Sequence, residues 1–137
     1  MPAPQELVQQ VPLFSSLGKK ELQTLANSMK ERIFAPGDTI AKEGQSGVGF
    51  FIIDDGEATV SVGGVERRTF KHGDYFGEVA LIDDGARTAT ITAKTELKCY
   101  GITSWEFRPL VEQNAELAWK MLQTMAKRLR EAEQRSA

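Results

Sequence analysis

Residues 75–90 of this chain read YFGEVALIDDGARTAT, and this stretch decides how the whole sequence is interpreted. Its pattern predicts the end of a strand, a glycine, a short helical turn with one carboxylate, an acidic loop, and an arginine that opens the next strand. Helix N-terminal amides and a guanidinium together favour an anion. The carboxylate cannot bind that anion, but it can accept a hydrogen bond from a neighbouring hydroxyl. A nucleotide whose phosphate is closed into a ring meets both requirements.

The same residues resemble the phosphate-binding cassette of the cyclic nucleotide-binding domain family, which includes the catabolite activator protein, regulatory subunits of protein kinase A and nucleotide-gated channels. The family pattern is roughly F-G-E-x-A-L, a short variable loop, and R-[ST]-A. Here it reads FGEVAL at residues 76–81 and RTA at residues 87–89. The resemblance extends from LFSSL at residues 13–17 to the C-terminal helix. It implies a cyclic nucleotide ligand, cyclic AMP in preference to cyclic GMP, and no cofactor.

The resemblance assigns ligand contacts to eight cassette residues, namely Phe76, Gly77, Glu78, Val79, Ala80, Arg87, Thr88 and Ala89. Arg87 would hold the phosphate, because a planar guanidinium binds two oxygens at once and stays charged. Glu78 would accept a hydrogen bond from the ribose 2′-hydroxyl, and Gly77 would let the backbone approach the ligand closely. Two alternatives remain open. Arg87 could form a surface ion pair with Asp83, Asp84 or Glu78, and Glu78 could cap the short helix.

Contacts to the base are expected from outside the cassette. Val62, on a strand that faces the cassette, is a candidate apolar contact for the purine, although it could equally belong to the core. The C-terminal helix resembles the lid of the family, with four candidates to close over the base: Leu122, Met125, Arg128 and Leu129. The same helix carries a seam at heptad spacing, so the chain could be a monomer or a homodimer through this helix.

The expected fold class is α+β, an antiparallel, jelly-roll-like β-roll with an N-terminal helical segment and two C-terminal helices. Apolar residues at helical spacing predict helix within residues 5–32. Between residues 33 and 102, short alternating runs separated by turn signals predict strands, and the cassette lies at residues 75–89. Residues 103–135 are expected to be helical, and residues 1–137 to form a single domain, since no linker or repeat interrupts them.

Capping signals divide the C-terminal helical region. The stretch TSWE at residues 103–106 has the form of a capping box, with Thr103 at the N-cap and Glu106 reaching back. Pro109 lies late for a first turn, which predicts a short, bent helix. Asn114 is then expected to be the N-cap of a second helix that runs to about Glu133.

Composition and charge exclude several classes of protein. The net charge of -2 argues against direct binding of nucleic acid, which requires a basic face. No apolar run is long enough for a membrane span, and the start of the chain does not have the form of a signal peptide. The single cysteine, Cys99, alternates with Leu97 as a buried strand residue would, and is compatible with a reducing cytoplasm. A cytoplasmic location is therefore expected.

Catalysis and metal binding are not expected. His72 is the one histidine and lies on a predicted turn, so a metal site with several imidazoles cannot be assembled, and a catalytic triad would need His72 alone as its base. The acidic pairs at residues 54–55 and 83–84 are interpreted as solvated turns. The basic cluster RRTFKH at residues 67–72 is likewise interpreted as a solvated face.

The expected function is a sensor that binds cyclic AMP in the β-roll and moves its C-terminal helix to signal to an unidentified protein effector. One alternative is a nucleotide-free domain with a structural or interaction role. Another is a fragment of a larger cyclic AMP-regulated channel or transcription factor.

Overall fold

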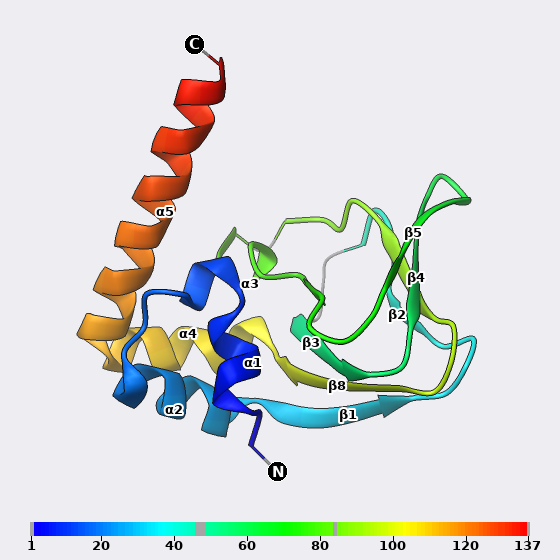
Figure 1. Cartoon of the computed structure of the whole chain (residues 1–137), viewed down its shortest axis with the longest axis horizontal. Coiled ribbons are helices and arrows are strands. Elements are labelled where there is room, and N and C mark those ends of the chain that lie inside the picture. The colour runs from blue at the N-terminus through cyan, green and yellow to red at the C-terminus, as the bar shows by residue number, and fades with distance from the viewer. Residues whose placement is uncertain (1, 46–48, 84, 137) are drawn as a thin grey trace.

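Two four-stranded antiparallel sheets face each other to form a roll, and the helices gather at one end of it (Figure 1). The computed structural model describes residues 2–45, 49–83 and 85–136, so Asp84 lies outside the described residues. The strand orders are β1-β8-β3-β6 and β2-β7-β4-β5. The strands are β1 (Lys30–Phe34), β2 (Thr39–Ala41), β3 (Phe50–Asp55), β4 (Ala58–Val62), β5 (Val65–Phe70), β6 (Tyr75–Phe76), β7 (Thr90–Ala93) and β8 (Leu97–Ile102). The predicted α+β β-roll is confirmed.

The N-terminal helical segment is divided into three short pieces. These are α1 (Gln5–Gln9), the 3-10 turn η1 (Pro12–Phe14) and α2 (Lys19–Ser28). The prediction of helix as far as residue 32 is wrong, because β1 already begins at Lys30 and Met29 has extended dihedral angles, φ -84° and ψ 141°. β1 pairs with β8 along its whole length, from Lys30 opposite Gly101 to Phe34 opposite Leu97. The hydrogen bonds of this ladder override the helical pattern of the preceding residues.

The C-terminal region contains the two predicted helices, α4 (Ser104–Gln113) and α5 (Ala115–Ser136). The capping box is confirmed, since Thr103 Oγ1 accepts from the Glu106 amide and Glu106 Oε1 accepts from the Thr103 amide at 3.1 Å. Pro109 lies inside α4, which continues through it. Asn114 occupies the predicted N-cap position of α5, since the helix begins at Ala115 and the Ala118 amide donates to the Asn114 carbonyl at 3.1 Å. Its side chain does not cap α5, because Asn114 Nδ2 donates to the Leu110 carbonyl at 2.6 Å. Asn114 therefore closes the end of α4.

The sheet that contains β3 and β8 separates two apolar clusters. Phe50 and Ile52 of β3 face the helical end and belong to one cluster, while Phe51 and Ile53 face the interior of the roll and belong to the other. Alternate residues of a strand point to opposite faces, so β3 contributes to both clusters. Cys99 lies in the roll cluster, as predicted for a buried cysteine, and burial raises the pKa of its thiol to about 12.

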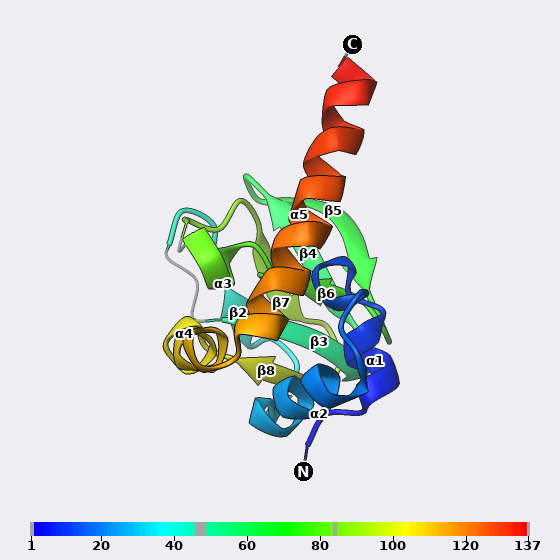
Figure 2. The same cartoon turned by 90° about the vertical axis from the view of Figure 1, so that its left-hand side faces the viewer.

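Helix α5 packs on the N-terminal helices along its first half and projects beyond the body of the molecule along its second half (Figures 1 and 2). Leu117 and Met121 are buried, and the helix contacts η1. Thr124 Oγ1 shares a hydrogen bond of 2.6 Å with Ser16 Oγ, and Lys120 forms an ion pair with Glu21. Within residues 2–45, 49–83 and 85–136, no helix combines the length and apolarity that crossing a membrane would require.

Candidate functional site

A hollow of about 450 Å³ lies over the cassette, residues 75–89, and we call it the cassette hollow. Strands β4 to β7, the short helix α3 (Ala80–Asp83) and the loop that follows it form its walls. All eight cassette residues that the sequence singled out line it: Phe76, Gly77, Glu78, Val79, Ala80, Arg87, Thr88 and Ala89. The chain therefore brings the predicted phosphate and hydroxyl contacts together around one space.

Gly77 allows the cassette to close on itself. Its φ of 88° lies in the left-handed region, which favours glycine. A Cβ atom at this position would overlap Arg87 Nη1 and the carbonyl oxygen of Gly49. Only a residue without a side chain leaves room for the guanidinium to lie under the turn, so Gly77 sets the position of Arg87.

Arg87 is held between the two sheets by the backbone. Its Nη2 donates to the carbonyl of Gly49, just before β3. Its Nε is buried and forms no hydrogen bond with the described residues. Burial lowers the pKa of the guanidinium below its ordinary value, because desolvation disfavours the charged form. Arginine nevertheless stays protonated at any physiological pH, so the site holds a partly desolvated positive charge.

The alternative in which Arg87 forms a surface ion pair receives no support from the described residues. Neither Asp83 nor Glu78 forms an ion pair with it, and Asp84 lies outside the described part of the chain. Asp83 instead accepts a hydrogen bond of 3.0 Å from the Gly85 amide, which stabilises the loop. The guanidinium is thus left facing the cassette hollow without a carboxylate from Asp83 or Glu78.

Glu78 is the one charged residue among those described that is buried, with 8% of its surface exposed. Its Oε1 lies 3.4 Å from Nη2 of Arg128, which belongs to α5, fifty residues further along the chain. Its Oε2 is buried and accepts no hydrogen bond from the described residues. The cassette thus contains a buried carboxylate oxygen and a buried arginine Nε that are both available to a ligand.

Backbone amides add donors to the same side of the hollow. The first hydrogen bonds of α3 run from the amides of Ile82 and Asp83 to the carbonyl of Val79. The amides of Val79, Ala80 and Leu81 precede these bonds and have no partner within the helix, as at any helix start. Together with Arg87 they give this part of the hollow a positive potential.

The opposite wall of the hollow is apolar and aromatic. Phe70 of β5 and Phe76 of β6 stack with their ring centroids 6.1 Å apart and their planes 10° apart. Val60 and Ile91 complete this wall. Val62, the predicted apolar contact, is not among the residues that line the hollow. It pairs with Val65 at the tip of the hairpin, beyond a register shift at Val60 and Ser61. Val60, two residues earlier, occupies the place expected for Val62.

Arg68 is a site residue that the sequence analysis missed, having assigned it to a solvated face. It lines the cassette hollow, and its Cζ lies 4.7 Å above the centroid of the Phe70 ring. The spacing offers a signal in hindsight, because residues 68 and 70 of one strand point to the same face. A guanidinium placed on an aromatic ring is favourable by itself, and here it also sets two cationic groups on one hollow.

The predicted lid residues on α5 differ in their positions. Arg128 contacts Glu78, whereas Leu122, Met125 and Leu129 are 57%, 38% and 62% exposed. None of the four is among the residues that line the cassette hollow. Closure of α5 over a base therefore stays a prediction.

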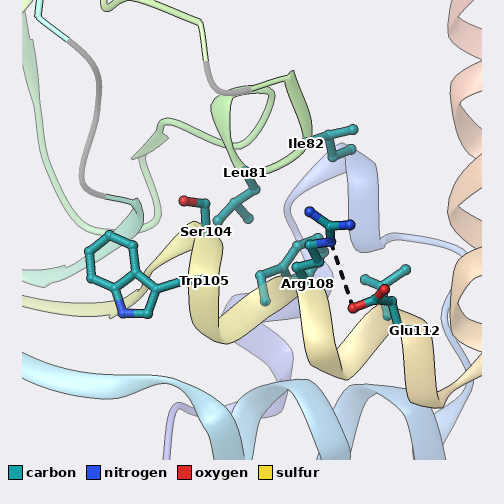
Figure 3. A pocket seen from close by; sticks show the side chains of 8 residues that line it. Leu81, Ile82, Ser104, Trp105, Arg108 and Glu112 are labelled. Carbon is teal, nitrogen blue, oxygen red and sulfur yellow. Dashed lines mark ion pairs between the residues drawn. The ribbon is translucent and has the colours of Figure 1, made fainter.

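A second hollow, of about 480 Å³, lies on the other side of α3, between α3 and α4 (Figure 3). Leu81 and Ile82 approach it from α3, and Trp105 and Arg108 from α4. Its only ion pair within the described chain joins Arg108 Nε to Glu112 Oε1 at 3.7 Å on the exposed surface of α4. None of the eight cassette residues predicted to contact a ligand lines this second hollow, whereas all eight line the cassette hollow.

Comparison with known proteins places these features in a family. Residues 31–114 match the model described as the cyclic nucleotide-binding domain. The chain is 43% identical over 93 residues to a cAMP-dependent protein kinase regulatory subunit of Yarrowia lipolytica, covering 66% of this chain and 25% of that protein. It is 35% identical over 125 residues to the same kind of subunit from Blastocladiella emersonii, covering 88% of this chain and 31% of that protein.

A solved structure resembles the chain over almost its whole length. The crystal structure of the N-terminal domain of a transcriptional regulator from Streptomyces coelicolor A3(2) superposes with a TM-score of 0.86 and 28% sequence identity. The superposition covers 96% of the present chain and 95% of the Streptomyces chain. The curated relatives are longer, and the present chain spans about a quarter to a third of the length of the two just described.

Proposed function

Because the chain belongs to the cyclic nucleotide-binding domain family, we propose that it binds cyclic AMP in the cassette hollow and acts as a regulatory module. One observation carries this proposal. Glu78 Oε2 and Arg87 Nε are the two buried side-chain polar atoms, among the described residues, without a hydrogen-bond partner. One is an acceptor and the other a donor. Buried polar atoms without partners are costly, and a ligand with one hydroxyl and one phosphate would satisfy both.

The phosphate would lie against Arg87 and the amides of Val79 to Leu81. The guanidinium has five N–H donors, of which one is engaged with the Gly49 carbonyl. Nε and the remaining donors are free to bind phosphate oxygens in a bidentate manner. The single negative charge of a cyclic phosphate would then neutralise a cation that burial has partly desolvated.

The ribose hydroxyl would donate to Glu78 Oε2. The other oxygen, Oε1, would keep its ion pair with Arg128. A carboxylate that accepts from both partners is held in one orientation, so the ligand and α5 would support the same rotamer of Glu78. This arrangement connects the cassette to the C-terminal helix through a single side chain.

We further propose that nucleotide binding repositions α5, and that this motion signals to a protein effector. The anchored first half of α5 would act as the pivot, and Arg128 would report the state of Glu78 to the second half. A ligand biases such an equilibrium only through contacts that differ between the two positions, and the Glu78–Arg128 pair supplies one. The proposal includes no catalysis, and His72 donates from Nδ1 to the Asp54 carbonyl at 2.7 Å, outside the cassette hollow.

Cyclic GMP is a second candidate ligand, which one observation favours. Arg68 faces the hollow beside the aromatic wall on which a base would stack. Guanine presents two adjacent acceptors, O6 and N7, to a guanidinium, whereas adenine presents one acceptor and one donor. The names of the relatives favour cyclic AMP, and Arg68 favours cyclic GMP, so competition between the two nucleotides is the decisive comparison.

Titration calorimetry with cyclic AMP tests the proposed function. Arg87→Ala should weaken binding by about 2–5 kcal/mol, because the anion loses its charged partner in a desolvated site. Arg67→Ala, an exposed arginine of the neighbouring strand, is the matched control and should keep the affinity of the native chain. Native affinity in Arg87→Ala would refute the assignment.

A thermal shift experiment separates the proposal from a nucleotide-free role. A ligand that binds only the folded chain raises its melting temperature by mass action. If neither cyclic AMP nor cyclic GMP at millimolar concentration changes the melting temperature, the chain is a structural or interaction domain. In Arg68→Ala, the ratio of the two affinities should shift toward cyclic AMP, and an unchanged ratio would remove the case for guanine.

A further inference from the structure

We propose that a hollow of about 290 Å³ beside the start of α4 is a second ligand site, which takes a small aromatic molecule with one carboxylate. Its lining residues come from β1, β2, β3 and β8 and from the start of α4, and we call it the roll hollow. It shares no lining residue with the cassette hollow. The site stands on its own residues, and only its coupling to the nucleotide rests on the proposed function.

Aromatic and aliphatic side chains make up most of the roll hollow. Phe34 of β1 and Phe51 of β3 meet edge to face, with ring centroids 6.1 Å apart and planes at 79°. Ile40 and Ile102 lie beside them, and Trp105 borders the hollow with 65% of its surface exposed. Aromatic rings attract a further ring that is placed offset or edge-on. Because about 290 Å³ is at the lower end of ligand pockets, the space suits one ring or two fused rings.

Gly101 keeps the roll hollow open. It lies directly opposite Phe51 in the ladder between β3 and β8. A Cβ atom at Gly101 would lie 2.6 Å from two carbons of the Phe51 ring, which is closer than any two carbon atoms can pack. The ring lies against the backbone of β8 only because no side chain is present at position 101. A larger residue there would push the Phe51 ring out of this place and into the hollow.

Arg32 supplies the charge that selects a carboxylate. It lies on the same face of β1 as Phe34, because alternate residues of a strand point to the same side. Its side chain is exposed, so the guanidinium lies at the rim of the hollow. Within residues 2–45, 49–83 and 85–136 it forms no ion pair, and the neighbouring Glu31 pairs with Lys98 at 4.0 Å. A guanidinium binds both oxygens of a carboxylate in parallel.

Glu106 also lines the roll hollow, but it does not cancel the charge of Arg32. Its Oε2 lies 2.9 Å from Nζ of Lys30, and its Oε1 accepts from the hydroxyl and the amide of Thr103 at 2.7 and 3.1 Å. Both carboxylate oxygens are thus engaged. Among the described lining residues, Arg32 is the cation that remains for a ligand. A neutral aromatic molecule would leave this cation without a partner, and an aliphatic acid would leave the rings without one.

One aromatic ring connects the roll hollow to the cassette hollow. Phe51 lines the roll hollow, and its ring centroid lies 5.4 Å from that of Phe76, which lines the cassette hollow. A molecule packed on Phe51 would restrict this ring and thereby hold Phe76 in the wall on which a base would stack. Such preorganisation should strengthen nucleotide binding, and the nucleotide should strengthen binding in the roll hollow to the same extent.

Titration of the isotope-labelled chain with 1-naphthoate, followed by NMR, tests the site. The indole N–H signal of Trp105 should shift with added ligand. The signal of Trp119, the second tryptophan of the chain, should not, because Trp119 lies on α5 and does not line the roll hollow. The neutral 1-naphthamide should bind roughly 5-fold or more weakly, because it lacks the charge that pairs with Arg32. An unmoved Trp105 signal at millimolar naphthoate, or equal binding of the amide, would overturn the proposal.

Two arginine substitutions decide which hollow is occupied, since Trp105 borders both the roll hollow and the hollow between α3 and α4. Arg32→Gln should weaken naphthoate binding roughly 5-fold or more. Arg108→Gln is the matched control, because Arg108 is also exposed but lines the hollow between α3 and α4 (Figure 3). It should bind naphthoate like the native chain. Loss of binding in Arg108→Gln with native binding in Arg32→Gln would place the ligand between α3 and α4 and contradict the assignment.

Calorimetry with both ligands tests the coupling. Saturating naphthoate should strengthen cyclic AMP binding to the native chain roughly 5-fold, and the same concentration should have less effect in Arg32→Gln. Naphthoate should still bind to Arg87→Ala. Unchanged cyclic AMP affinity would overturn the coupling, and affinity that falls steadily with added naphthoate would place naphthoate in the cassette hollow and overturn the site. A chain that binds naphthoate but no cyclic nucleotide would refute the proposed function alone.

Discussion

The two halves of α5 belong to one helix but are held in different ways. Residues 115–124 pack on the N-terminal helices through Leu117 and Met121, with an ion pair at Lys120 and a hydrogen bond at Thr124. Residues 125–136 project from the body, and the ion pair from Arg128 to Glu78 is the one side-chain bond, within the described chain, between this half and the rest. The first half is fixed by apolar burial, and the second by a single charge.

The first half of α5 contributes to the stability of the fold, whereas the second half can change its position at little cost in free energy. A helix segment held by buried leucine and methionine contributes to the folding free energy under all conditions. A segment held by one partly exposed ion pair can change its position at a cost of only about 1 kcal/mol. The sequence of α5 thus combines a permanent anchor and an adjustable end without a break between them.

The largest expected effect concerns the anchor. Leu117→Ala should lower the free energy of unfolding by about 2–5 kcal/mol, because it leaves a cavity at a fully buried position. Leu129→Ala, at an exposed position of the second half, should change it by less than about 0.5 kcal/mol. Urea unfolding at low chain concentration measures both. Equal costs would show that the two halves are held alike.

Helix α4, which packs against α5, begins with a capping box whose stability depends on pH through Glu106. Hydrogen bonds from Thr103 and then Lys30 hold the pKa of this carboxyl at about 2, below its ordinary value of 4.5. A depressed pKa in the folded chain adds stability above pH 4.5, and this contribution is lost as the pH falls toward 2. Glu106→Ala should therefore cost about 1–2 kcal/mol at neutral pH and show a flatter acid dependence in urea titrations. Glu112→Ala, at an exposed position of the same helix, is the matched control for the loss of stability at neutral pH.

The adjustable half should respond to Arg128. Arg128→Gln should lower the free energy of unfolding by about 1 kcal/mol, because the substitution removes the charged partner of the buried Glu78 carboxylate. The loss should be no larger, since the Arg128 side chain is itself partly exposed. Amide hydrogen exchange should quicken across residues 125–136 and stay unchanged across residues 115–124. Faster exchange in both halves would contradict a helix with one fixed end.

The smallest expected effect lies at the boundary between the halves. Ser16→Ala removes the hydrogen bond to Thr124 and should cost about 0.5–1 kcal/mol, because a neutral, exposed hydrogen bond contributes little net stability. Ser15→Ala, whose hydroxyl bonds only within η1, is the neighbouring control for thermal unfolding. A loss of more than about 1 kcal/mol in Ser16→Ala would show that this hydrogen bond, and not apolar burial alone, holds the first half of α5.

The cassette could be predicted from the sequence because its parts are close together in the chain. Phe76 to Ala80 and Arg87 to Ala89 lie within fourteen residues, and a short segment with a glycine and two charged groups constrains its own geometry. Arg68 is indicated only by its spacing from Phe70 along one strand, and Gly49 could not be found from the sequence. Gly49 meets Arg87 only because β3 crosses behind the cassette, thirty-eight residues from it. Long-range pairing of strands leaves no local signal.

Val62 lies near the tip of the β4–β5 hairpin and does not line the cassette hollow, whereas Val60 does, so a contact of Val62 with a purine stays a prediction. The error at the start of β1 has a local cause. The polar start of β1, with Lys30, Glu31 and Arg32, reads as the end of a helix until its pairing with β8 is known. The single-domain boundary and the lid roles of Leu122, Met125 and Leu129 stay predictions.

Strand β3 brings the two apolar clusters into contact with each other's neighbours, because its alternate residues belong to different clusters. Phe51 lies 5.4 Å from Phe76 inside the roll, and its neighbour in sequence, Phe50, lies 5.6 Å from Phe14 among the helices, both measured between ring centroids. The wall between the two compartments is thus one peptide thick. Phe76 contacts Phe51, and the neighbouring Phe50 contacts Phe14 of η1, so two ring contacts connect Phe76 to Phe14. The two residues are sixty-two positions apart in the sequence. One strand therefore lies between η1 and the interior of the roll, and a fluorescent probe attached near Phe14 should respond when the rings on the other side of the sheet move.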